Sequence, residues 1–142
     1  MMPSGSTLGS AVLAVDTNVL VRLLVSDDLA QQRAVALRLQ KAQAEGDSVL
    51  VTPVVLAEVA WVLDSAYGYG RSDIAAAIRR LVSTSPLVSP ERADVLRALG
   101  WYAKGTADFA DYLILALSKA HGARTLLTFD RRLLRHGSCE RP

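Results

Sequence analysis

Two short apolar runs, each followed directly by an aspartate, constrain the fold of this chain most. Residues 11–15 read AVLAV before Asp16, and residues 125–129 read TLLTF before Asp130. Runs of this length and apolarity are typical of strands that are buried in a parallel sheet. Parallel strands end at the same edge of their sheet, which is where α/β proteins place their sites. We therefore expect the two carboxylates to lie close together.

The rest of the sequence predicts one further strand and a series of helices. Residues 48–51, SVLV, predict another strand, and the expected helices begin near residues 17, 28, 53, 71, 90, 107 and 130. Thr52–Pro53 and Ser89–Pro90 are favoured ways to start a helix, with a capping hydroxyl before a proline. This alternation predicts a three-layer α/β fold, with a parallel sheet of about four strands flanked by about seven helices.

Composition indicates one domain with a real core. The chain has 142 residues, of which 51% are hydrophobic, and a net charge of +2 that does not by itself identify a nucleic-acid binder. A single cysteine, Cys139, allows no disulfide within the chain, which favours a reducing compartment such as the cytoplasm. We expect no signal peptide and no membrane span. The predicted division is a Gly/Ser-rich flexible extension (1–10), a domain (11–136) and a C-terminal tail (137–142).

Basic residues gather toward the C-terminus. Residues 119–142 hold six Lys or Arg against two acidic residues, and Arg131 and Arg132 follow Asp130 directly. The planar guanidinium suits phosphate groups better than an ammonium does. Arg131 and Arg132 are therefore candidates for contacts with a phosphate backbone, although ordinary solvated arginines would look the same.

Three acidic positions have both a structural and a functional interpretation. Asp16 and Asp130 could each cap the helix that follows, or serve a site at the strand ends, with Thr17 and Asn18 orienting Asp16. Glu58 is the only charged residue between Pro53 and Leu63. A buried, unpaired carboxylate costs several kcal/mol, so Glu58 needs a partner, a metal ion or an exposed position.

Asp108 and Asp111 open the helix of residues 107–120. Acidic residues at a helix start are stabilised by the helix dipole, and Thr106 is a candidate N-cap, so Asp108 has a plain structural explanation. Asp111 lies further into an apolar stretch, where we expect capping to explain it less well. The sequence therefore predicts Asp111 as a site residue and Asp108 as its helper.

A cluster of these carboxylates would need a compensating charge. Like charges raise one another's pKa, and an all-oxygen set of ligands favours Mg²⁺ or Mn²⁺ over zinc. Such a metal polarises phosphate oxygens and activates water. The predicted chemistry is hydrolysis of a phosphodiester.

Four segments, in order, resemble the motifs of PIN-domain ribonucleases. They are VDTNVLVRLLVSDD (15–28), VVLAEVAWVLDSAYG (54–68), ADFADYLILALSKAHG (107–122) and TLLTFDRRL (125–133). The resemblance is greatest to the VapC-like toxins of bacterial type II toxin–antitoxin pairs. It implies a PIN-like fold and identifies the acidic residues as catalytic and metal-binding: Asp16, Glu58, Asp111 and Asp130, with Asp108 auxiliary and Thr17 and Asn18 supporting.

The same resemblance implies an endoribonuclease that depends on Mg²⁺ or Mn²⁺, that a cognate antitoxin protein neutralises, and that forms a homodimer. It implies no nucleotide cofactor. Two features depart from the family pattern, namely the length of the segment before Ala11 and the ending HGSCERP, which is not strand-like.

Other classes of protein are less consistent with the sequence. An aspartyl phosphatase would need a second aspartate at position 18, which is Asn18, and a receiver domain would need a lysine after a late strand. An NAD-binding module would need a Gly-rich turn after the first strand. A PIN-like module that binds metal or RNA without cleaving it remains the main alternative.

Overall fold

A computed structural model describes residues 11–142 of the chain. The predicted extension, residues 1–10, lies outside the described residues. Three parallel strands form the main sheet in the order β1-β2-β3, namely β1 (Val12–Ala14), β2 (Ser48–Leu50) and β3 (Leu87–Val88). Leu13 lies opposite Val49, and Val49 lies opposite Leu87. The predicted α/β class with parallel strands is confirmed.

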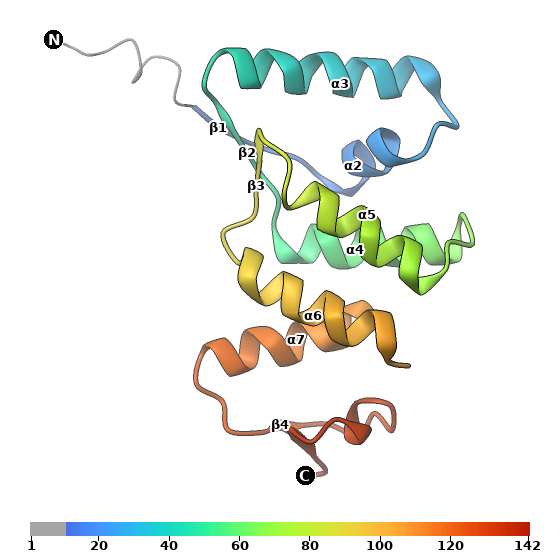
Figure 1. Cartoon of the computed structure of the whole chain (residues 1–142), viewed down its shortest axis with the longest axis vertical. Coiled ribbons are helices and arrows are strands. Elements are labelled where there is room, and N and C mark those ends of the chain that lie inside the picture. Colours follow the sequence, from blue (N-terminus) through green and yellow to red (C-terminus); the bar gives the residue numbers. More distant parts are fainter. Residues whose placement is uncertain (1–10) are drawn as a thin grey trace, which may run out of the picture.

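Six α-helices connect and cover these strands. They are α2 (Thr17–Leu24), α3 (Leu29–Ala44), α4 (Pro53–Ser65), α5 (Arg71–Leu81), α6 (Arg92–Lys104) and α7 (Phe109–Ala120). Figure 1 shows α3 at one end of the molecule, α4 and α5 beside the sheet, and α6 and α7 beyond them. None of the helices between residues 11 and 142 is long and apolar enough to cross a membrane.

Apolar side chains from all six helices and from the main sheet form one continuous core. Large residues with almost no exposed surface include Leu20, Val49, Leu56, Leu63, Ile78, Leu99 and Phe109. The ring of Phe109, at the start of α7, meets Tyr102 of α6 edge to face at 5.8 Å. The start of α7, which carries the predicted Asp111, is therefore fixed against the body of the protein.

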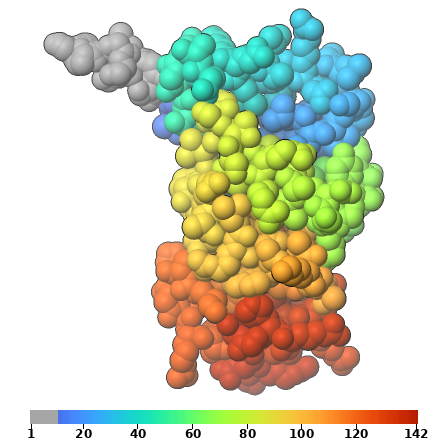
Figure 2. Space-filling model, in the orientation of Figure 1, coloured from blue at the N-terminus to red at the C-terminus, as the bar shows by residue number. Residues whose placement is uncertain are grey.

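The last 22 residues lie at the opposite end of the molecule from α3 (Figure 2), and they contain a second, smaller sheet. Strand β4 (Leu126–Leu127) pairs in parallel with β5 (Cys139–Glu140), and a 3₁₀-helix, η1 (Leu133–Arg135), connects them. This C-terminal region, residues 121–142, packs on α6 and α7. The ring of His136 lies against Trp101, and Lys119 Nζ donates to Ser138 Oγ at 2.7 Å.

Several details of the observed fold differ from the prediction. The main sheet has three strands, because the predicted strand 125–129 pairs with β5 instead. Strand β3 went unpredicted, and HGSCERP, which is not strand-like in sequence, contains β5. The predicted final helix is only a 3₁₀-turn, so the described residues hold six α-helices, close to the predicted number of about seven. Short parallel strands are fixed by distant partners, and for that reason they leave little local pattern.

Candidate acidic site

The first predicted carboxylates, Asp16 and Glu58, are linked through Thr17. Asp16 is exposed at the end of β1 and caps α2, since its Oδ1 accepts a hydrogen bond from Val19 N at 3.3 Å. Thr17 Oγ1 donates to Glu58 Oε1 at 2.8 Å. Thr17 therefore orients Glu58, and not Asp16 as expected. Asn18 is exposed.

Glu58 is exposed on α4, although its sequence neighbours are apolar. Of the positions that the sequence left open for Glu58, the structure has the exposed one, because the apolar neighbours Val54 and Trp61 are themselves largely exposed, at 69% and 68%. The side of α4 that carries Glu58 is therefore exposed to solvent, although most of the helix is apolar. This face leaves the carboxylate accessible to a ligand.

Asp108 and Asp111 form the start of α7 together. Asp108 is the N-cap, where Thr106 was one candidate, and its backbone N–H donates to Asp111 Oδ2 at 3.3 Å. Asp111 therefore takes part in capping, contrary to the expectation that it lies too far into the helix. Burial is the main cause that raises its pKa, and the charges of Asp130 and Asp108 raise it further.

Hydrogen bonds from other elements hold the segment before Asp108 in place. Arg71 of α5 donates to the carbonyl oxygens of Tyr102 and Ala107, and its guanidinium lies 4.0 Å from the centre of the Tyr102 ring. From the other side, the N–H groups of Thr106 and Ala107 approach the Tyr112 hydroxyl at 3.3 and 3.4 Å. The backbone that positions Asp108 and Asp111 is therefore held from both sides.

Asp130 is half-buried in the turn between β4 and η1. Its Oδ1 accepts hydrogen bonds from Arg132 N at 2.8 Å and Leu133 N at 3.2 Å. Arg132 Nε lies 3.9 Å from the same carboxylate oxygen, while Arg131 is exposed. Asp130 therefore stabilises its own turn, and Arg132 supplies the nearest positive charge.

Contacts connect the predicted acidic residues as two groups. Thr17 links Asp16 to Glu58, and Asp111 lies near Asp108 and Asp130, whose charges raise its pKa. Within residues 11–142, no three Asp, Glu, His or Cys side chains are close enough together to hold a metal ion. The oxygen ligands have the right chemistry for Mg²⁺, but this arrangement does not form a metal site.

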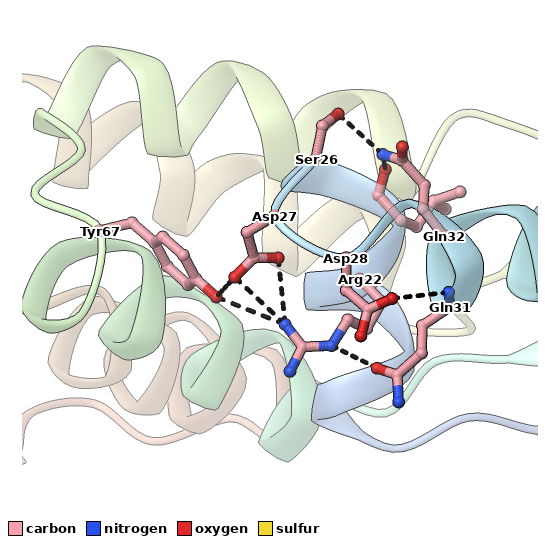
Figure 3. A network of polar contacts seen from close by, with 8 residues as sticks. Arg22, Ser26, Asp27, Asp28, Gln31, Gln32 and Tyr67 are labelled. Atoms are coloured by element: carbon pink, nitrogen blue, oxygen red, sulfur yellow. Dashed lines mark hydrogen bonds and ion pairs between the residues drawn. The ribbon is translucent and has the colours of Figure 1, made fainter.

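A polar network that the sequence analysis did not predict surrounds Arg22 (Figure 3). Arg22 and Gln31 line the same surface hollow as Asp16. Arg22 Nη1 is 3.1 Å from Asp27 Oδ1, its Nε donates to Gln31 at 2.6 Å, and the Tyr67 hydroxyl donates to Asp27 at 2.6 Å. The Tyr67 hydrogen bond, together with the charge of Arg22, lowers the pKa of Asp27. The network ties the α2–α3 connection to the turn that follows α4.

Comparison with known proteins identifies the family. The PIN domain matches residues 13–138, so the chain belongs to the PIN-domain family, whose members are in general nucleases. Among solved structures, the chain is similar to the Mycobacterium tuberculosis toxin VapC20, described as a sarcin–ricin loop cleaving toxin. That match has 17% identity and a TM-score of 0.38, and it covers 90% of this chain and 96% of the other. No curated protein matches the sequence significantly.

Proposed function

We propose that this protein is an endoribonuclease that depends on Mg²⁺ or Mn²⁺ and acts in the cytoplasm as the toxin of a toxin–antitoxin pair. The observation that carries the proposal is the PIN-domain match over residues 13–138, which spans all four predicted acidic positions. The order and spacing of the four motifs support the same activity. The resemblance of those motifs to VapC-like toxins is the basis for the antitoxin partner and for a homodimer.

The proposed active form brings the two groups of carboxylates together. Two exposed apolar surfaces support such an approach. Among the described residues β1 pairs only with β2, and Val12 on this edge strand is 71% exposed. At the other surface, Leu127 of β4 is 58% exposed, and Phe129 just after it is 73% exposed. Unpaired strand edges with exposed apolar side chains tend to find a partner strand.

Each group has a defined task in this proposal. Asp16, Glu58, Asp111 and Asp130 supply oxygen ligands, with Asp108 as an auxiliary carboxylate. Thr17 keeps Glu58 oriented, and Arg131 and Arg132 face the RNA backbone with positive charge. When bound, the cation would polarise a phosphate oxygen and lower the pKa of a water molecule. The protein's own contribution is to hold these side chains in place through the caps of α2 and α7.

Substitution of one carboxylate from each group tests the proposal. We expect Asp16→Asn and Asp111→Asn each to abolish Mg²⁺-dependent cleavage of RNA, measured on gels of purified protein, because each removes a charged metal ligand while keeping an oxygen for its cap. Asp73→Asn, on the exposed start of α5, is the matched control and should cleave like the wild type. Full cleavage by both variants would contradict the proposal.

One observation favours a second function. Within residues 11–142 no three carboxylates are close enough together to hold a metal ion, and a PIN-like binding module without nuclease activity would show the same. Such a module would bind RNA but leave it intact at every concentration of Mg²⁺ or Mn²⁺. The cleavage assay with wild-type protein therefore decides between the two functions.

A further inference from the structure

A cavity of about 380 Å³ lies between the end of α6 and the C-terminal region. Three cationic side chains line it, namely Lys104, Arg132 and Arg135, and no Asp or Glu does. Its volume is in the range of sites that bind small ligands or a single nucleotide. We refer to it as the basic cavity.

The cations of the basic cavity are poorly neutralised. Within residues 11–142, neither Lys104 nor Arg135 forms an ion pair with a carboxylate. Arg132 is 3.9 Å from Asp130, and its Nη1 donates to the carbonyl oxygen of Thr106 at 3.4 Å. Three positive charges around one cavity repel one another, and an anion that enters the cavity would relieve that repulsion.

Flat rings form another part of the wall. Trp101 is half-buried, and His136 meets it edge to face with ring centres 4.7 Å apart. Burial, and then the charge of Lys119, lowers the pKa of His136, so its ring is neutral near pH 7. Neutral aromatic surfaces beside cations are the combination with which proteins bind single-stranded nucleic acids, through stacking on bases and attraction to phosphates.

The basic cavity adjoins the second group of carboxylates. Arg132 contacts Asp130, and Tyr112, which also lines the cavity, directly follows Asp111. We propose that the basic cavity binds one nucleotide of single-stranded RNA beside the bond that is cut, with its phosphate on Lys104 and Arg135 and its base on Trp101. This inference rests on the proposed ribonuclease function and adds a substrate subsite to it.

Two glycines shape the cavity in different ways. A Cβ at Gly105 would clash with the Tyr112 hydroxyl, so this wall requires glycine. A Cβ at Gly100, which also lines the cavity, would have no atom within 4 Å. Gly100 therefore offers a position from which a larger side chain can fill the cavity without a backbone clash.

The first test measures RNA binding in the cleavage-inactive Asp16→Asn protein, with a fluorescein-labelled single-stranded RNA of mixed sequence. We expect Lys104→Gln and Arg135→Gln each to weaken binding. Each should also reduce the slope of log K against log salt by about 0.7, the value for one lost phosphate contact on a single strand. Arg79→Gln, on the exposed side of α5, makes the same charge change outside the cavity and should leave the slope unaltered.

The second test uses the fluorescence of Trp101. The chain has two tryptophans, so Trp61→Phe leaves Trp101 as the only one. We expect the same RNA, without its label, to quench this signal. Gly100→Leu should abolish the quenching, whereas Gly100→Ala, which adds only the tolerated Cβ, should preserve it.

The two proposals fail in different ways. Wild-type protein that does not cleave RNA would contradict the proposed function, whatever the binding results. Cleavage by the wild type, combined with unchanged affinity and salt slope in Lys104→Gln and Arg135→Gln, would overturn only the basic cavity as an RNA subsite. The same conclusion would follow if those substitutions weakened only the binding of a protein partner.

Discussion

The main sheet and the C-terminal region are built from the same kind of element but are held in place very differently. In the main sheet, β2 is paired on both sides, and helices contribute a core with many fully buried side chains. In residues 121–142, two-residue strands form the whole sheet, and Leu133 is the only buried side chain. Asp16 and Asp130 follow strands in these two unlike regions. The region that carries Asp130 is therefore the one with more freedom to move.

Deletion of buried apolar groups should expose this difference most strongly. Leu56→Ala in α4 removes a side chain with no exposed surface, and we expect it to lower the global free energy of unfolding by about 2–5 kcal/mol. Leu133→Ala should lower it less, because its region unfolds locally. Denaturant titration measures the first effect. Faster hydrogen exchange of two backbone N–H groups reports the second: Leu126 N donates to Ser138 O, just before β5, and Thr128 N donates to Glu140 O in β5.

The contrary result is that Leu133→Ala lowers the global stability as much as Leu56→Ala, without faster hydrogen exchange at Leu126 N and Thr128 N. The two regions would then unfold as one unit, and the difference proposed between them would be wrong. The freedom attributed to Asp130 would have to be withdrawn as well.

The turn at Asp130 provides a smaller, more local test. Asp130 Oδ1 accepts two backbone hydrogen bonds, so Asp130→Ala should cost about 0.5–1.5 kcal/mol for each bond lost, relative to Asp130→Asn, which keeps an oxygen. Thermal unfolding monitored in the C-terminal region measures this difference. Both variants should lack nuclease activity, since neither carries the charge. Nuclease activity in the Asp130→Asn variant would show that Asp130 is not part of the proposed active site.

The smallest expected effect concerns the pH dependence at Asp111. Because the folded-state pKa of Asp111 is raised above 3.8, its ionised form destabilises the fold at neutral pH. Asp111→Asn should therefore melt slightly higher than the wild type at pH 7. This difference in melting temperature should disappear as the pH falls through the raised pKa toward 3.8, since Asp111 in the wild type then becomes protonated. A difference in melting temperature that stays constant between pH 7 and pH 4 would contradict burial as the cause of the raised pKa.

Local chemistry allowed much of the fold to be predicted. Thr52 caps α4 as expected, with its hydroxyl oxygen 3.4 Å from Val55 N, and Asp28 caps α3. Ser89–Pro90 was less informative, because α6 begins at Arg92, after Glu91. Strand β3 escaped prediction because only Leu87 and Val88 lie between a proline and a serine. A two-residue strand has no alternation to detect.

The site was harder to predict than the fold, for a physical reason. The four motifs identify residue types that are suited to a metal ion, but their separation in space depends on which strands pair. The pairing of β4 with β5, and not with β1, has no local signature in TLLTF. Lys104 and Trp101 of the basic cavity likewise gave no signal, because the cavity forms only when α6 meets the C-terminal region.

Binding of Mn²⁺ measured by calorimetry tests the central claim most directly, namely that carboxylates from both regions share one cation. We predict that Asp16→Asn and Asp130→Asn each weaken Mn²⁺ binding by at least about tenfold, since even the loss of a group that only supports a ligand costs about 10–100-fold. Asp73→Asn should bind like the wild type. Wild-type affinity in Asp130→Asn, with binding lost in Asp16→Asn, would show that the two regions do not share a metal site and would contradict the account.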